Sequence, residues 1–162
     1  FFKRTPDLND LILNQDAIFV GGGNTKSMLA VWREWGLDKI LKKAYLNGTV
    51  MSGVSAGAIC WFQNGITDSW ASNLKMMPCL NFIKGTCCPH YDEEPERKPT
   101  VKNFLLRNKV KNIYAVDGGA ALHIKDEKIF KSIIFKKNKS SYLVDVKKKN
   151  INEKSFKKTI LI

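Results

Sequence analysis

Two short apolar runs that each end in a glycine-rich turn constrain the fold of this chain most strongly. The run Ala17–Val20 stops at the glycines 21–23, and the run Thr49–Met51 stops at the turn Gly53–Gly57. Apolar residues at helical spacing follow the first turn, and a second helix is predicted over Leu37–Leu46. Strands that alternate with helices through tight turns indicate parallel pairing. We therefore expect an α/β fold with a parallel sheet and helices on both faces.

The rest of the chain continues this pattern less regularly. We predict a helix over residues 99–108, a strand over 112–116 and a hairpin over 120–134 that turns at residues 126–127. A last strand is predicted over Tyr142–Val146. The tail after residue 147 alternates Lys with apolar residues, which suits an edge strand protected by charge. Since no linker divides the 162 residues, we expect a single domain over 1–162.

The net charge of +12 lies almost entirely in the C-terminal third. Residues 1–100 hold 11 basic and 10 acidic side chains, whereas residues 101–162 hold 16 basic and 5 acidic ones. Arg107 is the only arginine in that third. Since arginines and exposed aromatics usually read nucleic acids, a solvated lysine surface is favoured over a polyanion partner. No apolar run reaches the ~18 residues that would predict a membrane span.

The cysteines predict free thiols. Cys60, Cys79, Cys87 and Cys88 form no Cys-x-x-Cys pair, and the chain has two histidines. This pattern excludes the usual zinc signatures, so we expect no metal. Free thiols are typical of a reducing compartment, which predicts a cytoplasmic protein.

The second turn, Gly53-Val54-Ser55-Ala56-Gly57, fits the G-x-S-x-G nucleophile elbow and has the strand before it and the apolar helical pattern after it that this motif needs. A helix that starts at Ala56 would direct N–H groups and its positive end at a developing oxyanion. The alternative is a purely structural turn.

A serine nucleophile needs a base, and the chain offers His90 and His123. His123 lies in an alternating strand pattern, where a structural histidine is the simpler interpretation. His90 follows a proline at a predicted strand end, where functional side chains commonly project. His90 is therefore the candidate base.

Four segments together resemble the peptidase E family, the aspartyl dipeptidase and cyanophycinase group of serine peptidases. They are Val20-Gly21-Gly22-Gly23-Asn24-Thr25, Gly53–Ala58, Pro89-His90-Tyr91 and Asp117-Gly118-Gly119-Ala120. The resemblance implies a flavodoxin-like α/β fold, akin to class I glutamine amidotransferases, without a cofactor. It also implies a further strand and helix ahead of Phe1, so we expect a domain that is truncated at its N-terminus.

The resemblance assigns catalytic roles to particular residues. It makes Ser55 the nucleophile and His90 the general base, and the backbone N–H groups of Gly23 and Ala56 the oxyanion donors. Two residues compete for the acidic member of the triad. Asp117 matches the residue that supplies it in peptidase E and is favoured, while Asp68 is the alternative acid.

The resemblance also implies a short peptide substrate, with Asp-X dipeptides as candidates. It places Asn24 and Arg97 at the substrate. A guanidinium group is a suitable reader of a carboxylate, but an ordinary salt bridge within an acidic loop explains Arg97 equally well. We expect a monomer or homodimer. Two other interpretations are an inactive relative that acts as a binding module and a nucleic-acid-binding protein that uses the lysine-rich third.

Overall fold

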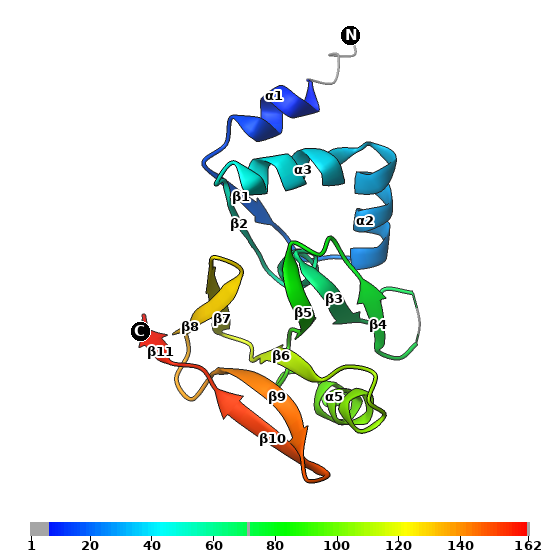
Figure 1. Ribbon diagram of the computed structural model, residues 1–162, viewed down its shortest axis with the longest axis vertical. Coiled ribbons are helices and arrows are strands. Elements are labelled where there is room, and N and C mark those ends of the chain that lie inside the picture. Colours follow the sequence, from blue (N-terminus) through cyan, green and yellow to red (C-terminus); the bar gives the residue numbers. More distant parts are fainter. Residues whose placement is uncertain (1–6, 71, 162) are drawn as a thin grey trace. The chain divides into compact units, whose positions relative to one another are not determined.

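A computed structural model describes residues 7–70 and 72–161 and divides the chain into two compact units, residues 1–58 and 59–162 (Figure 1). Each unit is described by itself. Among the helices of these described residues, none is both long and apolar enough to cross a bilayer.

The first unit holds a two-stranded parallel sheet and helices over residues 8–13, 25–34 and 37–46, the first of which packs on the third (Figure 1). β1 and β2 pair in register from Ala17 with Val50 to Val20 with Gly53. The predicted strand over residues 17–20 and helix over 37–46 are confirmed. The elements are α1 (Leu8–Leu13), β1 (Ala17–Val20), α2 (Thr25–Glu34), α3 (Leu37–Leu46) and β2 (Val50–Gly53).

The helix that follows the second turn is much shorter than its apolar sequence suggests. α4 spans Ala56–Ile59 only, a single turn, and β3 (Phe62–Thr67) begins three residues later. The apolar side chains from Ile59 to Phe62 are buried, so packing rather than helical periodicity explains them. The expected contribution of a helix dipole at Ala56 is correspondingly small, because one turn aligns few peptide groups.

The second unit is built around a mixed six-stranded sheet in the order β10-β9-β6-β5-β3-β4. β3, β5 and β6 are parallel, while β4, β9 and β10 join antiparallel. The predicted strand over 112–116 is confirmed, and the tail forms the expected edge strand. Further elements are β4 (Lys75–Pro78), β5 (Ile83–Cys88), α5 (Arg97–Leu106), β6 (Asn112–Val116), β9 (Ser141–Lys147) and β10 (Asn150–Ser155).

α5 packs on β6 and β9 of this sheet (Figure 1). The side chains at this contact form a buried apolar cluster that includes Tyr91, Val101, Ile113 and Val144. Burial of such side chains is the main favourable term in folding. The four cysteines are buried and free, as predicted.

A smaller sheet, in the order β11-β8-β7, completes the second unit. The predicted hairpin is confirmed as β7 (Ala120–Lys125) and β8 (Lys128–Ile134), and β11 (Lys158–Ile160) pairs with β8. Asp126 and Glu127 have φ of 51° and 59°, the left-handed state of a tight two-residue hairpin turn. The α/β class is thus confirmed, but the large sheet is mixed rather than wholly parallel.

Candidate active site

Ser55 lies directly beyond β2 in a strained backbone state. Its φ is 55°, in the left-handed region that residues with a Cβ seldom adopt. Such strain persists only where the surroundings impose it, and it concentrates at functional sites. This is the backbone geometry that the G-x-S-x-G motif predicts for a nucleophile.

The two glycines of the motif are required by close backbone contacts. A Cβ on Gly53 would lie 2.4 Å from the carbonyl oxygen of Gly57, and one on Gly57 would lie 2.1 Å from that of Val20. Neither distance is compatible with a side chain. The turn therefore packs tightly onto the end of β1, and this packing holds Ser55 in its strained state.

The glycine turn after β1 lies beside Ser55, as predicted. A Cβ on Gly22 would lie 3.5 Å from Cβ of Ser55 and 4.0 Å from its Oγ. Gly23 belongs to the same turn and has a φ of 145°. Asn24 caps α2, with its Oδ1 accepting from the N–H of Ser27 at 2.9 Å. Within the first unit, Gly22 thus brings the turn that includes Gly23 and Asn24 close to Ser55.

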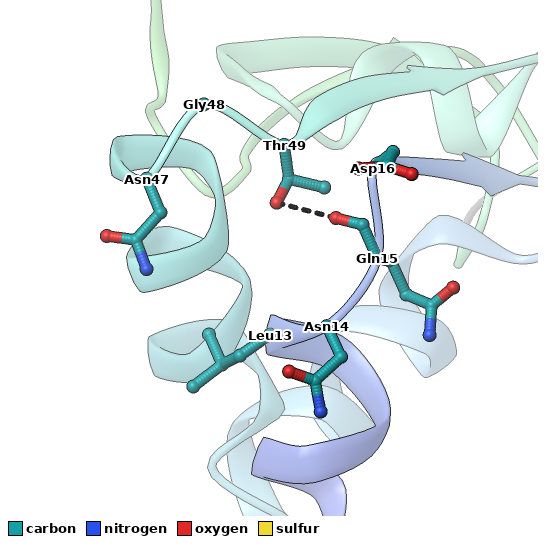
Figure 2. A pocket seen from close by; sticks show the side chains of 7 residues that line it. All are labelled: Leu13, Asn14, Gln15, Asp16, Asn47, Gly48 and Thr49. Carbon is teal, nitrogen blue, oxygen red and sulfur yellow. Dashed lines mark hydrogen bonds between the residues drawn. The ribbon is translucent and has the colours of Figure 1, made fainter.

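A shallow pocket of about 280 Å³ lies at the end of β1 and β2 that is opposite to Ser55 (Figure 2). Its lining residues precede β1 and β2, and Thr49 donates to the carbonyl of Gln15 at 3.1 Å. Ligands of parallel α/β sheets bind beyond the carboxyl ends of the strands, where Ser55 lies. This pocket is therefore no substrate site for Ser55.

His90 belongs to the second unit and follows β5. Its φ of 53° is also left-handed. The Nδ1 atom of its ring lies 2.7 Å from Oε2 of Glu93, and the two side chains are 28% and 44% exposed. A candidate base therefore has a carboxylate on one ring nitrogen, the arrangement that orients histidine in hydrolases.

The carboxylate of Asp117 is buried and bound by other groups. It accepts from the N–H of Ser140 at 2.9 Å and from the hydroxyl of Tyr142 at 3.1 Å. Burial raises the pKa of Asp117 above its usual value. Burial and the charge of Asp117 raise the pKa of Tyr142 to about 12.

A third carboxylate, that of Asp92, ties the same region together. It accepts from the N–H of Gly118 at 2.8 Å and pairs with Lys139. Burial alone would raise the pKa of Asp92, but Lys139 and the Gly118 N–H outweigh it and hold that pKa below its usual value. Asp92 is therefore ionised and joins the His90 loop to the Asp117–Gly118 turn.

The remaining predicted residues have clear surroundings. Asp68 is exposed in the loop after β3, and no hydrogen bond or ion pair joins it to another described residue. Arg97 is only 4% exposed. Its Nε donates to Glu94 and its Nη1 to the carbonyl of Ile66, both at 2.8 Å. These contacts fit the interpretation of Arg97 as part of an ordinary salt bridge.

Glu93 is the functional candidate that sequence reasoning missed. The sequence did contain a signal, because Glu93 stands three residues after His90, a spacing at which side chains in a tight turn can meet. Three other acids, Asp92, Glu94 and Glu96, lie close to Glu93 in the sequence, so this spacing did not single it out. No cluster of three or more His, Cys, Asp or Glu side chains within the described ranges could hold a metal ion.

Comparison with solved structures supports the α/β fold. The chain resembles a crystal structure, at 1.5 Å, of a Listeria monocytogenes EGD-e protein described as a peptidase E, with a TM-score of 0.53 and 20% identity. The match covers 92% of this chain and 64% of that one.

Comparison of sequences gives the family. The chain is 42% identical over 153 residues to an uncharacterized peptidase, YgaJ, of Bacillus subtilis (strain 168), covering 94% of this chain and 66% of YgaJ. It is 30% identical over 128 residues to peptidase E of Haemophilus influenzae (strain ATCC 51907 / DSM 11121 / KW20 / Rd), covering 72% and 58% respectively. It thus spans less than two thirds of the length of these relatives. The profile of peptidase family S51 matches residues 2–132, most of the chain including Ser55 and His90, and the chain therefore belongs to peptidase family S51.

Proposed function

We propose that the protein is a serine peptidase in which Ser55 is the nucleophile and His90 the general base. The observation that carries the proposal is the left-handed φ of 55° at Ser55, between two glycines whose positions leave no space for a Cβ. Membership of peptidase family S51 supports it. The flavodoxin-like arrangement implied by the family resemblance is part of this proposal.

The reaction would proceed in two halves. His90 takes the proton of the Ser55 hydroxyl as Oγ attacks the scissile carbonyl, and the oxyanion is held by the N–H groups of Gly23 and Ala56. The C–N bond then breaks, and His90 returns the proton to the leaving amine. His90 then deprotonates a water that attacks the acyl carbonyl, the ester bond to Oγ breaks, and His90 returns the proton to Ser55. The route needs no metal or cofactor, and Asp117 stays the sequence-based candidate for the acid.

For the substrate we propose short peptides, with Asp-X dipeptides as candidates and Asn24 beside the reacting group. The relatives described as peptidase E support a peptide substrate. Both hydrogen bonds of Arg97 are made within its own unit, which favours an ordinary salt bridge over a role as reader of the acidic side chain. A cytoplasmic monomer or homodimer completes the proposal.

Covalent labelling with a fluorophosphonate tests the nucleophile. We expect the purified protein to gain one label at Ser55 and to hydrolyse a panel of short peptides, and Ser55→Ala to lose both. The matched control is Ser52→Ala, because Ser52 lies on β2, three residues before Ser55, and its hydroxyl donates to the carbonyl of Ile18. A protein that takes no label, or hydrolysis that survives Ser55→Ala, would refute the proposal and favour an inactive relative.

A further inference from the structure

We propose that Glu93 is the positioning residue of His90: its carboxylate accepts the Nδ1–H and fixes the ring tautomer that leaves Nε2 as the base. This inference rests on the proposed function, because it names the group through which His90 acts. It assigns to Glu93 the part that the family resemblance assigns to Asp117.

The first argument is geometric. Nδ1 of His90 lies 2.7 Å from Oε2 of Glu93, the length of a charge-assisted hydrogen bond. Neutral imidazole has one N–H, and a carboxylate on Nδ1 holds it there. The lone pair is then on Nε2, which is the atom that must accept the proton of a serine hydroxyl.

The second argument is the space that Gly118 leaves. A Cβ on Gly118 would lie 1.9 Å from Oε1 and 2.0 Å from the carboxyl carbon of Glu93. The carboxylate therefore occupies the volume that any other residue at position 118 would fill. Gly118 has no left-handed backbone to explain its lack of a side chain. The absence of a Cβ at Gly118 leaves room for the Glu93 carboxylate beside the ring of His90.

The third argument is that the neighbouring carboxylates serve other partners. Asp117 accepts from the N–H of Ser140 and the hydroxyl of Tyr142. Asp92 accepts from the N–H of Gly118 and pairs with Lys139. Glu93, by contrast, contacts the His90 ring at Nδ1.

The assignment can be tested in the folded protein, because a substitution of Glu93 should have a small effect on stability and a large effect on catalysis. Both side chains are partly exposed, and an ion pair at such a site contributes little to stability. Loss of the carboxylate that orients a catalytic histidine costs on the order of 10²–10⁴ in kcat. A substitution of Glu93 should therefore reduce catalysis while hardly changing stability.

The experiment compares Glu93→Gln, Gly118→Ala and the control Glu96→Gln in the full chain. Glu96 is an exposed acid of the same loop with no side-chain capping bond. We expect Glu93→Gln and Gly118→Ala to lower kcat on a hydrolysed peptide about 10²–10⁴-fold with little change in KM. Glu96→Gln should retain the activity of the unmodified protein. Urea unfolding checks that each variant is folded.

A second readout does not depend on peptide hydrolysis. The ¹⁵N chemical shifts of the His90 ring report its tautomer, and we expect Nδ1–H in the unmodified protein and a mixture with Nε2–H in the first two variants. Retention of the tautomer and of kcat in Glu93→Gln would overturn the inference, most directly if Asp117→Asn abolished both. If Ser55 takes no fluorophosphonate label, the proposed function fails, whereas the tautomer measurement still decides the role of Glu93.

Discussion

Ser55 and His90, the proposed nucleophile and base, share an uncommon backbone state. Their φ values are 55° and 53°. Each of the two residues lies two positions beyond the end of a strand, β2 for Ser55 and β5 for His90. A left-handed conformation costs a residue with a Cβ about 1–3 kcal/mol, so local packing must hold both residues in place. At Ser55 that packing is the contact of Gly57 with the end of β1.

Substitution of Gly57 should therefore break the elbow. Gly57→Ala places a Cβ 2.1 Å from the backbone carbonyl oxygen of Val20, which cannot move without displacing β1. We expect a loss of about 2 kcal/mol or more in the free energy of unfolding, measured with urea, and loss of fluorophosphonate labelling at Ser55. The control is Gly21→Ala, since nothing lies within 4 Å of a Cβ there. Equal urea midpoints for the two variants would contradict this account of the elbow.

Among the elements, α5 is anchored at its first residue by a buried charge. The guanidinium of Arg97 joins Glu94 in the preceding loop to the carbonyl of Ile66 on β3. A planar group with several fixed donors can satisfy both partners at once, whereas the single ammonium of lysine cannot. Arg97 therefore connects the loop that carries His90 and Glu93 to the sheet.

Arg97→Lys should lower stability rather than change specificity. We expect a loss of about 1–3 kcal/mol in the free energy of unfolding, because a buried carbonyl loses its partner. Lys102→Ala, at an exposed position of the same helix, should change stability by less than about 0.5 kcal/mol. For substrate choice, the ratio of kcat/KM between Asp-X and neutral dipeptides should stay the same in Arg97→Lys. A selective loss of Asp-X hydrolysis would instead show that Arg97 reads the substrate.

At the scale of the whole molecule, charge is distributed unevenly between the units. Residues 59–162 hold 20 basic and 10 acidic side chains, whereas residues 1–58 hold 7 and 5. Many of the lysines lie on β9, β10 and the segments beside them, where they protect the edge strand. Such an excess of one sign makes a compact state repel itself.

Moderate salt should therefore stabilise the protein. Raising NaCl from about 0.01 M to about 0.15 M shortens the Debye length from ~30 Å to ~8 Å and screens the lysines from one another. We expect the urea midpoint to rise across this range. A variant with Lys147, Lys148 and Lys149 replaced by Gln should show a smaller rise. A midpoint that falls with salt would mean that exposed ion pairs outweigh the repulsion.

The local sequence pattern was sufficient to predict many of the elements. The strand over 17–20, the helix over 37–46 and the hairpin near residue 126 follow from periodicity and turn residues alone. β3 escaped prediction, and of β5 only the end before His90 was predicted, because each strand has a glycine and polar residues within it, which weakens the β signal. Their pairing depends on the neighbouring strands rather than on their own sequence.

By itself the sequence determined the α/β class and the glycine turn around Ser55, and it made His90 the candidate base, because glycine turns, apolar periods and the scarcity of histidine are properties of the chain itself. Only the tertiary structure decided which carboxylate contacts His90. Asp92, Glu93 and Asp117 all carry a carboxylate, so residue type alone does not distinguish them. The N–H of Ser140 binds Asp117, Lys139 pairs with Asp92, and the carboxylate of Glu93 fills the space beside Gly118. Folding brings these groups to the acids from distant parts of the chain.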